Sequence, residues 1–175
     1  MPRDSEQVLT EWLVLHAQSG SAQALDQLLK LWYPKLLRYA AGQTQGRDAA
    51  KDVVQETLLS VAKRIRRLDD PAAFPKWLYR ILERRIADHL RTEIRHRRDD
   101  SVAGETDTRT AELGPETSLE DALGSLAEES YRVVHLRYLI GLSIKEIASL
   151  IDVPEGTVKS RLHSARAQLR NLLTE

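Results

Sequence analysis

The clearest pattern along the chain is a pair of short amphipathic helices near its end. Ser143 and Glu146 have the S-x-x-E spacing of a capping box, which predicts that a helix begins at Ser143. Residues 152–154 then interrupt the apolar repeat, and Pro154 suits the first turn of a second helix. The second helix carries apolar residues at steps of four and three: Val158, Leu162, Ala165, Leu169 and Leu172. The pattern predicts a helix-turn-helix.

The second helix is polar or basic on its other faces. Lys159, Arg166 and Arg170 lie on one shoulder of the apolar stripe, and Arg161 lies on the other. A helix that reads DNA needs this layout, because its N-terminal residues reach base edges while basic side chains meet phosphates. A helical hairpin with a solvated basic face is the structural alternative, and the capped first helix with its short turn favours DNA binding.

Four longer helices are predicted upstream, because apolar residues recur there at helical spacing. They cover about residues 5–18, 22–39, 47–67 and 75–97. Pro34 is expected to kink or split the second of them. The first helix places Val8, Trp12 and Leu15 on one side. The fourth steps by four through Leu78, Leu82, Ile86, Leu90 and Ile94.

Residues 99–117 differ from the segments on either side. They are polar and acidic, contain Gly and Pro, and lack an apolar period, so they predict a flexible linker. Helical patterns resume over about residues 118–126 and 128–140, and no strand is predicted. The predicted fold is all-α, with two helical domains joined by a flexible acidic linker: residues 1–98, 99–117 and 118–175.

The composition narrows the class of protein. The chain has 175 residues without cysteine, which excludes disulfides and Cys-ligated zinc. No apolar run is long enough to cross a membrane and the N-terminus lacks an apolar signal core, so we expect a cytoplasmic protein without membrane insertion. The net charge is zero, yet residues 98–130 hold two Lys or Arg against ten Asp or Glu. The acid is therefore concentrated between two mildly basic segments, each suited to phosphate.

The fourth helix is rich in arginine. Arg80, Arg84, Arg91 and Arg95 suit phosphate contacts, and a merely solvated helix face explains them equally well. Trp77 could offer a stacking surface to unpaired bases, although its place beside the apolar stripe fits the core better.

Two other clusters have alternative interpretations. Asp48, Asp52 and Glu56 share one face of the third helix, where they serve solubility or meet a basic partner. His89, Glu93 and His96 also share a helix face, but nearby arginines oppose a cation there, so no metal site is predicted. No glycine-rich phosphate loop, nucleophile elbow or paired buried carboxylate appears, and neither a cofactor nor an enzyme is predicted.

Three segments resemble parts of the extracytoplasmic-function (ECF) sigma factors of bacterial RNA polymerase. DAAKDVVQETLLSVAKRI, residues 48–65, resembles the region-two helix that docks on the polymerase clamp. FPKWLYRILERRIADHLR, residues 74–91, resembles the family's helix at the minus-ten promoter element. LSIKEIASLIDVPEGTVKSRLHSARAQLR, residues 142–170, resembles region four, which reads the minus-thirty-five element.

The resemblance implies three sets of binding residues. Contact with core polymerase is implied for Asp48, Asp52, Gln55 and Glu56. Contact with the minus-ten element is implied for Asp69, Asp70, Lys76, Trp77, Arg80, Arg84 and Arg91. The loop at residues 66–73 matches one that captures a flipped base. At the minus-thirty-five element we expect Thr157, Ser160, Arg161 and His163 near bases, and Lys159, Arg166 and Arg170 near phosphate.

Two positions depart from the family pattern. Arg84 stands where the family usually has Asn, and Asp152 stands where it often has Gly. Asp tolerates the left-handed backbone of such a turn better than most residues, so the turn is expected to survive.

The expected function is that of a sigma factor that binds core polymerase, directs it to promoters and melts the minus-ten element. Its expected partners are core RNA polymerase, promoter DNA and an anti-sigma factor, and the free chain is expected to be a monomer. Two alternatives stay open: a stand-alone helix-turn-helix regulator, and a sigma-like interaction protein without promoter activity. Segment 48–65 favours the sigma factor over the regulator, which has no need of a polymerase-docking helix.

Overall fold

The computed structural model describes residues 5–99 and 119–174 of the chain. The chain divides into two compact units, Met1–Glu93 and Ile94–Glu175. All regular elements among the described residues are helical, which confirms the all-α prediction. The predicted linker, residues 99–117, lies outside the described residues except for Asp99, so the predicted domain limits remain predictions.

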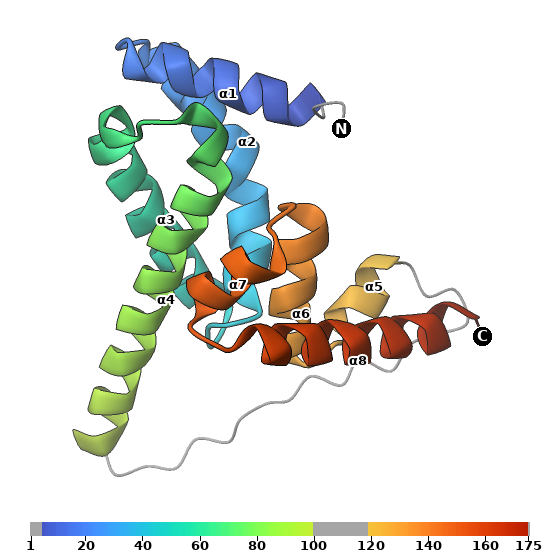
Figure 1. The fold of residues 1–175 in the computed structure, drawn as a ribbon. Helices are drawn as coiled ribbons and strands as arrows, with labels where there is room; N and C mark the ends of the chain where they lie inside the picture. The colour runs from blue at the N-terminus through green and yellow to red at the C-terminus, as the bar shows by residue number, and fades with distance from the viewer. Residues whose placement is uncertain (1–4, 100–118, 175) are drawn as a thin grey trace. The chain divides into compact units, whose positions relative to one another are not determined.

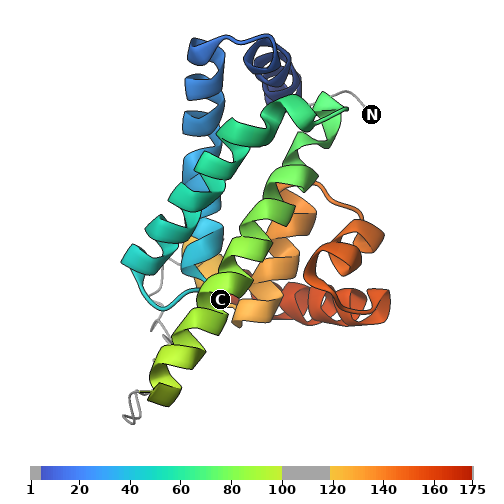
Figure 2. The ribbon, with the colours of Figure 1, turned by 90° about the vertical axis from the view of Figure 1, so that its left-hand side faces the viewer.

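The first unit holds the upstream helices (Figures 1 and 2). Its elements are α1 (Ser5–Gln18), α2 (Ala22–Ala41), α3 (Arg47–Arg64), η1 (Ile65–Arg67), η2 (Pro71–Ala73) and most of α4 (Phe74–Asp99), whose residues from Ile94 on belong to the second unit. In both views α2, α3 and α4 run side by side, and α1 packs against α2 and the two short 3-10 turns η1 and η2. The connection between α3 and α4, which contains η1 and η2, therefore lies beside α1.

An aromatic cluster forms the core between α2 and α4. Trp32 packs edge-on against Phe74 with ring centroids 5.7 Å apart, and Tyr39 packs edge-on against Tyr79 at 5.0 Å. Such pairs contribute about 0.5–1.5 kcal/mol beyond the area that they bury. The Tyr39 hydroxyl also donates a hydrogen bond to the buried carboxylate of Glu83. These contacts fix the first part of α4 against α2.

The buried face of α1 is not the one that carries its largest apolar residues. Val8, Trp12 and Leu15 share a face, but that face is half exposed, at 50%, 50% and 51%. The helix instead buries Thr10, Leu13, Val14 and Ala17. Residues 8–17 are apolar on most sides, so periodicity alone could not choose between the faces, and packing against α2 decides.

Of the two outcomes predicted at Pro34, a kink or a split, the split does not occur, because α2 is one helix that contains Pro34. A detail of α4 differs from prediction. The stripe of α4 is buried at Leu78, Leu82 and Ile86, but Ile94 is 54% exposed. In Figure 2 the end of α4 continues past α2 and α3, which explains why the stripe loses its cover.

The second unit consists of shorter helices that pack on α8. Its described elements are α5 (Leu119–Gly124), α6 (Glu128–Val134), η3 (His135–Leu139), α7 (Ile144–Ile151) and α8 (Glu155–Thr174). The helix predicted over residues 128–140 changes to a π-turn at η3, where the Ile140 N–H donates to the His135 carbonyl at 3.1 Å. His135 is buried there, 3.3 Å from the Tyr131 hydroxyl.

The helix-turn-helix prediction is confirmed by its local chemistry. The Glu146 N–H donates to Ser143 Oγ at 3.2 Å, and the Ser143 N–H donates to the Glu146 carboxylate at 2.9 Å, which completes the capping box. Asp152 adopts the left-handed conformation, with φ 54°. α8 begins at Glu155, and the Pro154 carbonyl accepts hydrogen bonds from Thr157 and Val158. The turn therefore survives with Asp in the position where Gly is common.

Candidate functional site

The first candidate surface is the exposed face of α3. Asp48, Asp52, Gln55 and Glu56 are all exposed there. The Asp48 carboxylate is 98% exposed and lies 3.5 Å from the Lys51 amine, one turn along the helix. Asp48 also lies in the first turn, where a negative charge complements the helix dipole. The structure therefore brings these four predicted residues onto one accessible surface.

An apolar hollow adjoins this acidic face. It has a volume of ≈ 370 Å³ and is lined by Leu29, Tyr33, Lys51, Gln55, Leu58, Leu59 and Ala62. Gln55 belongs to both surfaces. Leu59 and Tyr33 are 54% and 38% exposed, which is unusual for such large apolar side chains. The hollow was not predicted. The signal that could have found it is the adjacent pair Leu58–Leu59, because neighbouring leucines point in different directions from a helix and cannot both lie on one narrow apolar stripe.

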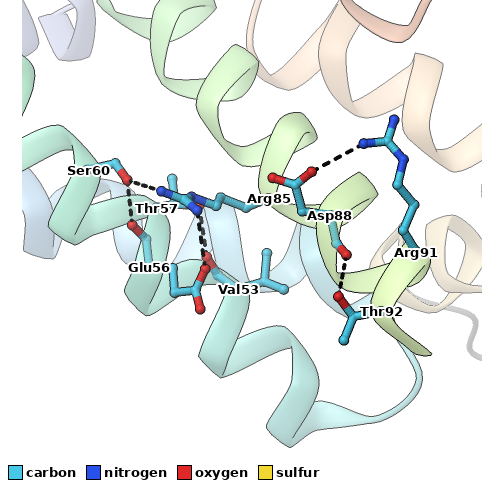
Figure 3. Close-up of polar contacts among 8 residues, drawn as sticks. All are labelled: Val53, Glu56, Thr57, Ser60, Arg85, Asp88, Arg91 and Thr92. Atoms are coloured by element: carbon cyan, nitrogen blue, oxygen red, sulfur yellow. Dashed lines mark hydrogen bonds and ion pairs between the residues drawn. The ribbon is translucent and has the colours of Figure 1, made fainter. Parts of the chain in front are cut away.

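Glu56 has a basic partner within the same unit. Arg85 of α4 approaches its carboxylate at 3.6 Å and donates a second bond to Ser60 Oγ at 3.0 Å, as Figure 3 shows. Ser60 Oγ in turn donates to the Glu56 carbonyl at 2.9 Å. This small network ties α3 to α4 while leaving the Glu56 side chain 63% exposed.

The second candidate surface is formed by the η1–η2 connection and α4. Asp69, Asp70, Arg80, Arg84 and Arg91 are exposed, whereas Lys76 and Trp77 are half-buried. The Asp70 carboxylate accepts a hydrogen bond from the Ala72 N–H at 2.9 Å and so caps η2. Arg91 pairs with Asp88 at 3.3 Å, one turn away on α4 (Figure 3). The Trp77 ring lies 6.0 Å from that of buried Phe74, so it is neither fully core nor fully free for stacking.

The third candidate surface is α8. Lys159, Ser160, His163, Arg166 and Arg170 are exposed, and Thr157 is half-buried. Arg161 lies against α6, where its guanidinium pairs with the Glu129 carboxylate at 2.5 Å. The Arg161 side chain is only 22% exposed, whereas that of Glu129 is 69% exposed. The apolar stripe is buried at Val158, Leu162 and Ala165, which leaves the polar side of α8 accessible.

Within residues 5–99 and 119–174, no group of three His, Cys, Asp or Glu side chains could hold a metal ion. His89 and Glu93 approach each other at 3.3 Å on α4, and no third ligand joins them within that part of the chain. No helix in residues 5–99 or 119–174 is long and apolar enough to cross a membrane.

The fold and these surfaces define a helical protein with a helix-turn-helix unit and a second, separately folded helical unit. Comparison with known proteins then gives the family. A family model described as "ECF sigma factor" matches residues 6–175. The chain is 30% identical to the ECF RNA polymerase sigma-E factor of Haemophilus influenzae, over 95% of this chain and 96% of that protein. It is 35% identical to the ECF RNA polymerase sigma factor SigL of Mycobacterium tuberculosis, over 90% and 95% respectively.

Solved structures agree with the sequence comparisons. The sigma factor RpoE of Bartonella quintana, in complex with the anti-sigma factor NepR, matches with a TM-score of 0.63 and 28% identity, over 85% of this chain and 96% of that chain. CnrH, solved with the cytosolic domain of CnrY, has the same fold at 24% identity and a TM-score of 0.58. The chain therefore belongs to the ECF sigma factor family. It is an RNA polymerase sigma factor, and its function lies in transcription initiation.

Proposed function

We propose that each of the three surfaces serves one step of promoter recognition. The α3 face and the adjoining hollow bind core RNA polymerase. The η1–η2 connection and α4 hold the unpaired minus-ten strand and melt the promoter there. The polar side of α8 enters the major groove at the minus-thirty-five element.

The α3 face is the observation that carries the proposal. It combines exposed acids with an apolar hollow, a pairing that suits a protein partner better than solvent. The acids supply electrostatic complementarity to a basic partner, and the hollow supplies a pocket for an apolar anchor. Nucleic acid is a poor candidate for this face, because its phosphates would meet Asp48, Asp52 and Glu56.

For the minus-ten strand, the support is the basic face of α4 next to an exposed turn. Arg80 and Arg84 are exposed and can meet phosphates. Asp69 is exposed in the turn just before α4, where a carboxylate can accept a hydrogen bond from the amino group of an unpaired base. Arg84 replaces the usual family Asn, and we propose that it adds a phosphate contact at this position.

An anti-sigma factor binds this chain when it is inactive, by analogy with the relative that was solved with NepR. The free chain is a monomer that works beside the polymerase in the cytoplasm and carries out no catalysis itself.

The decisive experiment is core binding followed by run-off transcription on genomic fragments. Initiation at defined start sites, with permanganate-reactive thymines near position minus ten, is the expected result. A chain that binds core polymerase but never opens DNA would contradict the melting step.

A matched pair of variants tests the docking face itself. Leu59→Arg places a charge in the hollow and is expected to lower core affinity by at least about tenfold, as for the loss of one well-packed anchor. Leu9→Arg is the control, because Leu9 is a similarly exposed leucine on α1, 46% against 54% for Leu59. Equal affinities for the two variants would remove the hollow from the interface.

A further inference from the structure

A side chain of α1 forms two hydrogen bonds to the connection between α3 and α4. Gln18, the last residue of α1, donates from Nε2 to the Ile65 carbonyl at 2.9 Å and to the Leu68 carbonyl at 2.6 Å. Both acceptors are backbone groups about fifty positions further along the chain. One amide therefore uses both of its N–H bonds to fix the two ends of η1.

The rest of the connection is ordered around these two bonds. The Ile65 carbonyl also accepts from the Leu68 N–H at 3.2 Å, and the Leu68 side chain is only 8% exposed. Asp70 caps η2 through the Ala72 N–H. With Leu68 turned inward, the residues on either side of it, Arg67 and Asp69, are exposed. Gln18 therefore helps to hold the backbone of Leu68, the residue directly before the exposed Asp69.

We infer that Gln18 is a positioning residue for the recognition of the unpaired minus-ten base. This inference rests on the proposed role of the η1–η2 connection. It assigns a DNA-related task to α1, a helix that contributes none of the residues predicted to contact DNA. The task is to hold the backbone of the connection so that the exposed carboxylates meet the base in one fixed geometry, without an ordering step on binding.

The structure offers a matched control on the same helix. Gln7 is exposed, and its Nε2 donates only to the Glu11 side chain one turn along, at 3.1 Å. Gln18→Glu and Gln18→Met keep the length of the side chain and remove both donors, and Gln7→Glu and Gln7→Met make the same changes away from the connection. The carboxylate of Gln18→Glu would in addition face two carbonyl oxygens.

The test uses the full chain assembled with core polymerase. Wild-type holoenzyme first selects single-stranded oligonucleotides from a randomised pool, and the selected strand is then resynthesised with each of the four bases at every position. We expect both Gln18 variants to lose about tenfold in discrimination at one position, with preferences elsewhere kept, as for one misplaced hydrogen bond in a recognition site. Core affinity should stay close to that of the Gln7 variants, while the melting temperature should fall modestly, because the Ile65 and Leu68 carbonyls each lose a part-buried hydrogen bond.

Three results would overturn the inference. Wild-type discrimination at every position in both Gln18 variants would show that base recognition does not require the two hydrogen bonds from Gln18. An equal loss at all positions, together with weaker core binding or a lower melting temperature, would show that Gln18 only maintains the fold. A wild-type holoenzyme that selects no strand would contradict the proposed function itself, and the inference with it.

Discussion

Two acid–arginine pairs, one in each unit, join a predicted binding residue to a partner that the sequence did not reveal. In the first unit, Glu56 is the predicted residue and Arg85 its partner, and Glu56 is the more exposed of the two, 63% against 35%. In the second unit, Arg161 is the predicted residue and Glu129 its partner, but here Arg161 is the more enclosed, 22% against 69%. The same chemistry therefore leaves one predicted residue available to a partner and holds the other against its own unit.

The difference teaches what a helical pattern can and cannot say. A pattern assigns a residue to one face of a helix, but the neighbouring helix decides whether that face is open. α3 presents Glu56 at an open edge, with Arg85 of α4 beside it (Figure 3). α6 lies against the shoulder of α8 that carries Arg161. A base contact by Arg161 must therefore compete with Glu129, whereas a polymerase contact by Glu56 does not require Arg85 to leave.

The largest expected effect comes from reversing a charge on the open face. Asp52→Arg should lower core affinity by at least about 100-fold while the fold stays intact, because like charges brought together at an interface cost several kcal/mol. Glu56→Gln should cost less, since Arg85 already offsets part of that charge. Binding of labelled core polymerase measures both. Glu11→Arg, at a partly exposed acid of α1, is the control, because α1 contributes no residue to the α3 face or the hollow. Wild-type affinity in Asp52→Arg would refute the docking face.

The enclosed arginine is tested on DNA. Arg161→Ala should lose about 1–3 kcal/mol of specific binding if it reads a base, and Arg166→Ala should weaken all sequences alike with a salt slope smaller by about one. Footprinting on matched and scrambled promoters at several salt concentrations separates the two effects. Indistinguishable losses would contradict a base-reading role for Arg161. The main role of Arg161 would then be the ion pair with Glu129 between α8 and α6.

A variant that destabilises the second unit without touching the proposed DNA surface of α8 serves as the reference for the two arginine variants. Ser143→Ala removes the capping box of α7 and should lower the free energy of unfolding by about 1 kcal/mol. Ser149→Ala, at an exposed serine of the same helix, should change it little. Thermal melting followed by circular dichroism measures both, and equal melting temperatures would show that the cap contributes nothing.

The smallest effect is the coupling within each pair. Double-mutant cycles with Glu56→Gln and Arg85→Met, and with Glu129→Gln and Arg161→Met, should give about 0.2–1 kcal/mol, as for other partly exposed ion pairs. The second pair should lie at the upper end, because its arginine is more enclosed and the approach is shorter, 2.5 Å against 3.6 Å. A larger coupling for Glu56–Arg85 would reverse the comparison.

The sequence predicted local structure well at positions where a backbone geometry favours particular residue types, such as helix caps and tight turns. The capping box at Ser143 and the left-handed Asp152 followed from the sequence, because their bonds and dihedral angles depend on near neighbours. The exposed side of α1 did not, because that helix is apolar on most sides and only α2 selects the buried one. The contacts of Arg161 with Glu129 and of Leu68 with Gln18 could not be predicted, because they join residues far apart in the sequence and periodicity reports only on neighbours within one helix.

The aromatic core of the first unit has a consequence for optical spectroscopy. All three tryptophans of the chain, at positions 12, 32 and 77, belong to Met1–Glu93, and Trp32 is 4% exposed among its aromatic neighbours. Emission excited selectively at tryptophan therefore follows the melting of the first unit alone, whereas far-ultraviolet circular dichroism follows the helices of both. Separate midpoints for the two signals would reveal that the units melt independently, and one unfolding free energy would then not describe the chain. The red shift as Trp32 becomes hydrated thus gives a label-free readout of the first unit.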